Sequence, residues 1–92
     1  MNILEYCDIL NVELDIKYYP NQGYRFTAQL YGAEVKDGSV LSSVYGTGTS
    51  PTCAIEHYIL AIRGKRLVFN AADPSKRREY DVPKYLIGLG KE

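Results

Sequence analysis

The sequence has few of the residues that build metal sites and disulfide frameworks. It contains no tryptophan, one histidine and two cysteines, Cys7 and Cys53, and it has no Cys-x-x-Cys pair. One histidine and two cysteines cannot close a zinc site by themselves, and two cysteines do not form a disulfide framework. We therefore expect reduced and mostly buried thiols, no bound metal and no cofactor.

Long apolar runs and a basic leader are also missing. The segment Met1 to Glu5 has no basic region, and no stretch of the chain approaches the length of a membrane span. We therefore expect no signal peptide, no contact with a membrane, and a location in a cytoplasm. The 92 residues predict a single domain, residues 1–92, with a small core.

The sequence also has no net charge, because eleven basic residues balance eleven acidic ones. The charges are nevertheless unevenly distributed along the chain. Residues 1–56 carry seven acids and three bases, a charge of −4, whereas residues 57–92 carry four acids and eight bases, a charge of +4. Such asymmetry between the two halves favours an electrostatic partner.

Apolar and polar residues alternate in the first half of the chain, which is typical of half-buried strands. The alternation predicts a hairpin of two strands over residues 12–19 and 24–30. Its phase changes at Gly32, where we expect a β-bulge. The pair Asp37-Gly38 favours a tight turn that leads into a third strand at residues 40–45.

The second half predicts one main helix. Ser50 is a favourable N-cap, Pro51 suits the first helical position, and Gly64 ends the helix after about Arg63. One side of this helix is apolar and carries Ala54, Ile55, Tyr58, Ile59, Ala61 and Ile62.

Two shorter elements complete the expected fold, a helix over residues 2–10 and a fourth strand within residues 65–71. The whole set predicts an α+β fold, with a three- to four-stranded antiparallel sheet and one main helix packed on one face.

The order of helix, three antiparallel strands and helix resembles the double-stranded-RNA-binding domain. In that family the last strand-to-helix junction reads Gly-x-Gly-x-Ser-Lys-Lys-x-Ala. Here the stretch from Gly46 to Ala54 keeps both glycines, the serine and the alanine, but Pro51 and Thr52 replace the two lysines. Because those lysines grip phosphates in the family, this departure counts against RNA binding.

The same stretch resembles the HicB antitoxin pattern, in which a Gly-x-Thr-Pro-like turn leads into a helix with small apolar residues. Residues 10–83 are also similar to small uncharacterised proteins encoded by bacteriophages. The matching residues are Tyr45 to Pro51, Ala54-Ile55, Tyr58, Gly64-Lys65 and Leu67-Val68. The resemblance implies a phage protein that acts in the cytoplasm of a host cell.

Two patterns raise the question of a catalytic or phosphate site. Cys53 and His57 lie one helical turn apart, but a Cys–His catalytic pair also needs an orienting group and a pocket, which so small a domain rarely provides. Gly46 and Gly48 precede a helix, yet the lysine of a P-loop is missing, which favours a structural turn. We therefore expect no catalytic residue and no small-molecule substrate.

Six of the eleven bases form a basic cluster within sixteen residues, with Asp73 as the one acid among them: Arg63, Lys65, Arg66, Lys76, Arg77 and Arg78. One interpretation is contact with RNA, DNA or an acidic protein surface. The other is a solvated face that balances acidic strands.

Nine tyrosines are a high number for a chain of this length. Tyr19, Arg25 and Tyr31 fall on the polar sides of their predicted strands. Exposed tyrosine is favoured at interfaces, because it offers a large contact area at a low entropy cost. Alternatively, another segment such as the C-terminal tail covers that face of the sheet. The predicted partner-binding residues are these three together with the basic cluster.

Two functions follow from these patterns. The first is a non-enzymatic inhibitor that docks on a host protein or ribonucleoprotein complex, such as an anti-CRISPR protein that blocks a crRNA-guided complex. The second is a nucleic-acid-binding module or a HicB-like antitoxin regulator. Small size and the phage-like resemblance favour the first, and the basic cluster favours the second.

Overall fold

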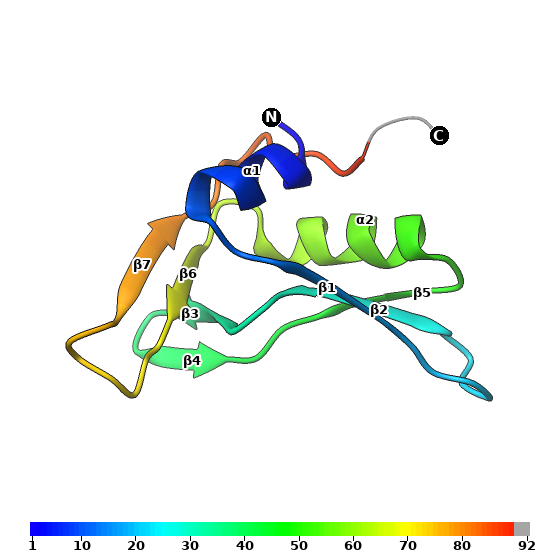
Figure 1. Cartoon of the computed structure of the whole chain (residues 1–92), viewed down its shortest axis with the longest axis horizontal. Helices are drawn as coiled ribbons and strands as arrows, with labels where there is room; N and C mark the ends of the chain where they lie inside the picture. The colour runs from blue at the N-terminus through cyan, green and yellow to red at the C-terminus, as the bar shows by residue number, and fades with distance from the viewer. Residues whose placement is uncertain (90–92) are drawn as a thin grey trace.

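The computed structural model describes residues 1–89, which form two helices and seven strands (Figure 1). The elements in chain order are α1 (Ile3–Leu10), β1 (Leu14–Tyr18), β2 (Phe26–Leu30), β3 (Ala33–Asp37), β4 (Val40–Ser42), β5 (Gly46–Gly48), α2 (Pro51–Ile62), β6 (Arg66–Phe69) and β7 (Arg78–Asp81). Lys91 and Glu92, which contribute to the charge of residues 57–92, lie outside the described residues. No helix within residues 1–89 is long and apolar enough to cross a membrane.

The α+β class is confirmed, but the strands form two antiparallel sheets instead of one. The first sheet has the order β1-β2-β5 and the second the order β4-β3-β6-β7. The chain passes from the first to the second between β2 and β3, where Gly32 adopts a φ of +78°. The expected β-bulge at Gly32 is therefore wrong. The change of phase there marks a change of sheet, which glycine permits because positive φ costs it little.

Helix α2 covers one face of the β1-β2-β5 sheet, as expected for the main helix (Figure 1). The side chain of Ser50 caps it by accepting a hydrogen bond from the backbone N–H of Cys53 at 3.1 Å. The buried side of the helix carries Ala54, Ile55, Tyr58, Ile59 and Ile62. Cys7 is buried in α1, but Cys53 is exposed, so the expected burial of both thiols is wrong for Cys53. Cys53 lies at the start of α2, beside Gly48 of β5.

Strand β5 lies directly on α2 because two of its three residues are glycines. A Cβ atom at Gly46 would collide with the backbone of Ala54 and Tyr58. At Gly48 it would lie 2.6 Å from the backbone nitrogen of Ala54. The glycine pattern, interpreted from the sequence as a turn, is therefore a short strand whose close approach to the helix excludes side chains.

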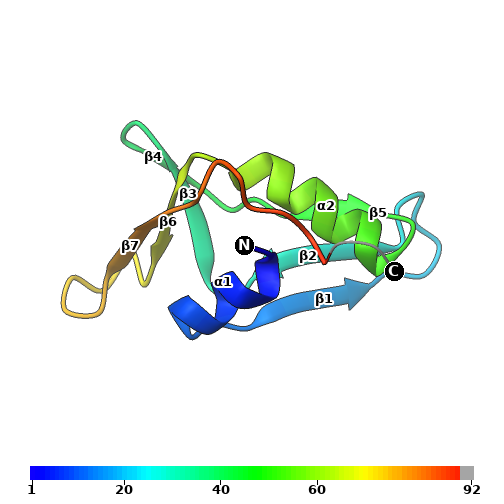
Figure 2. The same cartoon turned by 90° about the horizontal axis from the view of Figure 1, so that it is seen from above.

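The short helix α1 is also confirmed, and it begins with a capping box between Asn2 and Glu5. The C-terminal segment after β7 runs between the two helices (Figure 2). Its Ile87 N–H donates to the carbonyl of Met1 at 3.1 Å, and the Nε of Arg63 donates to the carbonyl of Leu86 at 2.7 Å. The described part of the tail, up to Leu89, thus closes the side of the core opposite the β1-β2-β5 sheet, and it does not cover the exposed face of that sheet.

Candidate binding surfaces

The β1-β2-β5 sheet has an outer face, turned away from α2, that no other element within residues 1–89 covers (Figure 1). Side chains alternate along β1, so Asp15 and Lys17 point to this face while Ile16 points to the helix side. A tyrosine hollow of about 260 Å³ lies on the outer face, lined by Asp15, Lys17, Tyr19, Gln22, Tyr24, Thr27, Gln29 and Tyr45.

Three tyrosines from three separate segments line this hollow. Tyr19 follows β1, Tyr24 lies in the turn before β2, and Tyr45 precedes β5, with exposed fractions of 40%, 39% and 51%. Thr27 is 9% exposed and forms part of its floor. The amide of Gln29 donates to the carbonyl of Ala33 at 3.4 Å and to Ser43 Oγ at 3.3 Å, which fixes its side chain. The hollow therefore combines aromatic walls with a polar floor.

The turn that carries Tyr24 is held by hydrogen bonds to both neighbouring strands. The backbone N–H of Tyr19 donates to the carbonyl of Arg25, and the N–H of Arg25 donates to the carbonyl of Gly48 at 3.0 Å. Arg25 also donates from its guanidinium to the hydroxyl of Tyr18 at 3.3 Å. Of the predicted binding residues, Tyr19 therefore lines the hollow, and Arg25 supports the strand beside it.

A second hollow, of about 290 Å³, lies where the two sheets meet, and its lining consists of Asn11, Val12, Glu13, Tyr31, Gly32, Phe69, Asn70 and Arg78. Two of the predicted binding residues come together here. Tyr31 is 67% exposed, and the guanidinium of Arg78 lies 5.8 Å from the ring centre of Tyr80. The lining of this junction hollow holds one base, Arg78, and one acid, Glu13, so their charges balance.

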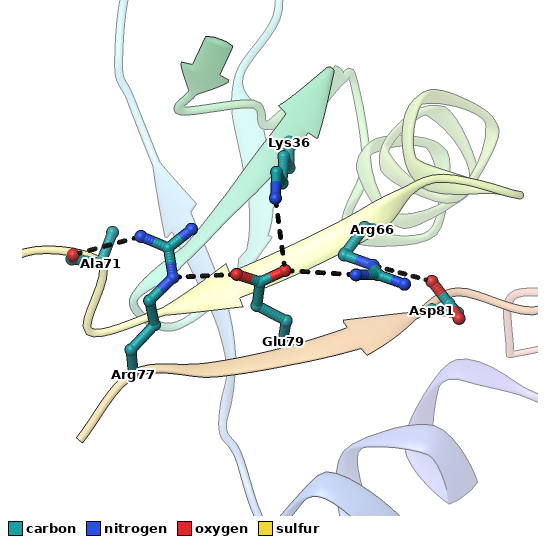
Figure 3. A network of polar contacts seen from close by, with 6 residues as sticks. All are labelled: Lys36, Arg66, Ala71, Arg77, Glu79 and Asp81. Carbon is teal, nitrogen blue, oxygen red and sulfur yellow. Dashed lines mark hydrogen bonds and ion pairs between the residues drawn. The ribbon is translucent and has the colours of Figure 1, made fainter. Parts of the chain in front are cut away.

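Two members of the basic cluster belong to a network of ion pairs on the β4-β3-β6-β7 sheet (Figure 3). Glu79 lies 2.9 Å from Arg77, 3.4 Å from Arg66 and 3.7 Å from Lys36. Arg66 also contacts Asp81 at 3.0 Å. The hydrogen bond from Arg77 lowers the pKa of Glu79, and the hydrogen bond to Asp81 raises the pKa of Arg66. The network neutralises these bases within the chain.

The remaining bases of the cluster are spread over the surface. Arg63 is bound to the tail, and the side chains of Lys65 and Lys76 make no ion pair within residues 1–89. Arg78 and Arg66 lie on opposite faces of their sheet, because Arg78 is opposite Phe69 and Arg66 is opposite Asp81 in the β6–β7 register. The six bases therefore do not form one continuous patch.

His57 has a structural partner of its own. Its Nδ1 accepts a hydrogen bond from the backbone N–H of Thr47 at 2.9 Å, and it lies 3.2 Å from the hydroxyl of Thr47. An accepting Nδ1 places the ring proton on Nε2. Within residues 1–89, no group of three or more histidines, cysteines and acids is arranged to hold a metal ion. The arrangement serves to cap the outer edge of β5.

Comparisons with protein families, curated proteins and solved structures find no match to this chain. The resemblances seen in residues 10–83 therefore stay predictions. The packing of Gly46 and Gly48 against α2 gives both glycines a structural reason to be present, without any phosphate ligand.

Sequence reasoning found Tyr19 but missed Tyr24 and Tyr45. Tyr24 falls on the apolar side of the predicted alternation, and Tyr45 ends a strand whose alternation is irregular. The signal that could have found them is their place in the chain: Tyr24 lies beside a turn and Tyr45 between two strands. Side chains at such positions are often exposed, because loops lie on the surface. Their convergence depends on pairing between β2 and β5, which local sequence does not specify.

Proposed function

We propose that the protein is a non-catalytic binding module that docks on another protein through the tyrosine hollow. The observation that carries the proposal is the convergence of Tyr19, Tyr24 and Tyr45 on one exposed, uncovered sheet face. Tyrosines dominate the binding energy of many protein interfaces, because their rings bury a large area and their hydroxyls find polar partners.

The charge of the hollow favours a protein partner over nucleic acid. Its lining holds one acid and one base, Asp15 and Lys17, whose charged atoms lie 3.7 Å apart. Such a surface offers no excess of positive charge to phosphates, which supply most of the affinity in nucleic-acid complexes. Polar groups beside aromatic walls are instead typical of the cores and rims of protein interfaces.

The specific form of this proposal is an inhibitor that docks on a host crRNA-guided complex, as an anti-CRISPR protein does. Its support is the small size of the chain and the resemblance of residues 10–83 to bacteriophage proteins. The hollow supplies such an inhibitor with a contact surface.

The first test removes two of the tyrosines. The double variant Tyr19→Ser/Tyr45→Ser should bind a purified crRNA-guided complex about tenfold or more weakly than the wild type, measured by interferometry. It should also lose protection of phage in plaque counts on a host with an active crRNA-guided system. Tyr85→Ser is the matched control, because Tyr85 is 70% exposed and lies outside the hollow.

Two outcomes contradict the proposal. If the double variant binds as tightly as the wild type and Tyr85→Ser, the hollow is not the contact surface. If the wild type binds no crRNA-guided complex, the inhibitor form is wrong.

The nucleic-acid alternative is tested by a gel-shift titration at two salt concentrations. Direct contact with a duplex would give a slope of log K against log salt of about −0.9 for each neutralised phosphate. Charge reversal at Lys65 and Lys76, two of the four cluster bases that make no ion pair within residues 1–89, would then flatten that slope. We expect weak binding and no measurable slope. Tight, salt-dependent binding to free duplex would rank the nucleic-acid function first.

A further inference from the structure

Strand β1 is an unprotected edge of the β1-β2-β5 sheet. It pairs with β2 on one side, and Figure 2 shows no helix or strand of residues 1–89 along its other side. An exposed edge presents unpaired backbone N–H and C=O groups, which makes it a template for another strand. Five residues, Leu14–Tyr18, form this edge.

The hydrogen-bonding pattern shows which backbone groups face outward. The N–H of Tyr31 donates to the carbonyl of Glu13 at 2.9 Å, and the N–H of Tyr19 donates to the carbonyl of Arg25. On the β1 side, both bonds use odd-numbered residues, Glu13 and Tyr19. In an antiparallel pair, the backbone groups of successive residues point alternately towards the partner strand and away from it. The backbone groups of Leu14, Ile16 and Tyr18 therefore point to the free edge.

The side chains of these outward-facing residues are apolar and incompletely covered. They point to the helix side of the sheet, where Leu14 and Ile16 are half-buried against the core and Tyr18 is 54% exposed. A strand added at this edge would cover all three side chains and satisfy their backbone groups in the same step.

We propose that the strand added at this edge is β1 of a second copy of the chain, paired antiparallel about Ile16. In this register Ile16 lies opposite Ile16 of the second copy, and Leu14 lies opposite Tyr18. Asp15 then lies opposite Lys17, and by the two-fold symmetry this pair of opposite charges occurs twice. The outward-facing residues of one copy meet those of the other, as the ladder of an antiparallel pair requires.

Within Leu14–Tyr18, the neighbouring registers bring like charges together and lose the two Asp15–Lys17 pairs. A shift of two residues in one direction places Asp15 opposite Asp15, and a shift in the other direction places Lys17 opposite Lys17. Like charges directly opposite each other are destabilising. A shift of one residue brings outward-facing groups against inward-facing ones and turns the side chains to the wrong face. The sequence Asp-Ile-Lys therefore selects one self-complementary pairing.

The other edge of the same sheet is closed, so this sheet does not grow beyond two copies. The outward N–H of Thr47 in β5 is already bound to Nδ1 of His57 at 2.9 Å. A contact through β1 alone uses the open edge of each copy once, so it closes as a dimer with a six-stranded sheet. In this dimer the two tyrosine hollows lie on the same outer face, on either side of the symmetry axis.

Sedimentation velocity of the whole chain, at rising concentrations up to about 1 mM, tests the dimer. We expect a reversible change from monomer to dimer and no larger species. Ile16→Pro should abolish the dimer, because proline removes the outward N–H, and proline is tolerated at an edge position whose N–H faces solvent. Ile16→Val, which keeps that N–H and the branched side chain, is the matched control and should still dimerise.

A charge swap tests the register independently of proline. Asp15→Lys or Lys17→Asp alone should weaken the dimer roughly tenfold, since each creates two pairs of like charges. The double variant Asp15→Lys/Lys17→Asp should restore dimerisation. A wild type that stays monomeric at every concentration overturns the proposal, and so does a double variant that dimerises no better than the single variants. Neither result bears on whether the tyrosine hollow binds a partner protein, which is measured separately.

Discussion

The two edge strands of the β1-β2-β5 sheet differ in whether their outward backbone groups are bonded within the chain. Strand β5 has three residues, lies against α2, and has its outward N–H at Thr47 capped by His57. Strand β1 has five residues, and no helix or strand in the described part of the chain runs along its outer side (Figure 2). One side chain on a neighbouring helix therefore protects the β5 edge, and the β1 edge, which has no such side chain, is free to pair with another strand.

The largest effect is expected from a substitution that disrupts the packing of β5, the closed edge, against α2. Gly46→Ala places a Cβ atom against the backbone of Ala54 and Tyr58. Because backbone cannot move aside as a flexible side chain does, we expect a loss of about 3 kcal/mol in the free energy of unfolding, or complete unfolding. Urea denaturation measures the loss.

The control for this substitution is Gly38→Ala. Gly38 has a φ of +64° and no atom within 4 Å of an added Cβ, so only backbone strain is introduced there. We expect a loss of about 1 kcal/mol. Equal losses at the two glycines would mean that β5 does not depend on close contact with α2.

His57→Ala should open the closed edge and make it resemble β1. The Thr47 N–H loses its acceptor, which should cost about 1 kcal/mol of stability. With two open edges, the chain should also form species larger than a dimer in sedimentation velocity. His57→Asn offers a shorter acceptor as the comparison. A His57→Ala variant that is as stable as the wild type and stops at the same size would show that His57 protects nothing.

An effect of similar size, confined to alkaline pH, concerns Tyr58, the buried tyrosine of α2 beneath the closed edge. Burial raises its pKa from 10.0 to about 12. The pKa of Tyr58 is higher in the folded protein than in the unfolded chain. The contribution of this group to stability is therefore fully present below pH 10 and is lost as the pH rises from 10 towards 12. At pH 11 we expect the free energy of unfolding to be about 1 kcal/mol lower than at pH 9, as a result of this group.

Tyr58→Phe separates this effect from the other tyrosines. Burial also raises the pKa of Tyr6 to about 12, so the variant should keep part of the alkaline loss. Urea denaturation at pH 9 and pH 11 compares the two proteins. An alkaline loss that is identical in wild type and variant would contradict the role given to Tyr58.

Much of the fold was predictable where local patterns determine it. Alternation predicted the β1–β2 hairpin, and Ser50, Pro51 and Gly64 predicted the bounds of α2 to within a residue. The second sheet was not predictable, because alternation shows which face a residue occupies and does not show which sheet its strand joins. Gly32 was therefore interpreted as a bulge within one sheet.

The candidate site was predicted only in part, for the same reason. Tyr19 was found because it follows an alternating strand, whereas Tyr45 reaches the hollow only through the pairing of β2 with β5. The ion-pair partners of the basic cluster were not predicted, although Glu79 and Asp81 follow the cluster closely in the sequence. Their strand, β7, is largely polar, so its pairing with β6 had no apolar signal.

The contrast between the two edges is tested most directly by amide hydrogen exchange, followed residue by residue in NMR spectra at low and high protein concentration. The account predicts that the amide of Thr47 is protected at both concentrations, because His57 accepts its hydrogen bond. It predicts that the amides of Leu14, Ile16 and Tyr18 exchange rapidly at low concentration and become protected as the dimer forms. Exchange at Ile16 that does not change with concentration, or exchange at Thr47 as fast as at Ile16 in the monomer, would contradict it.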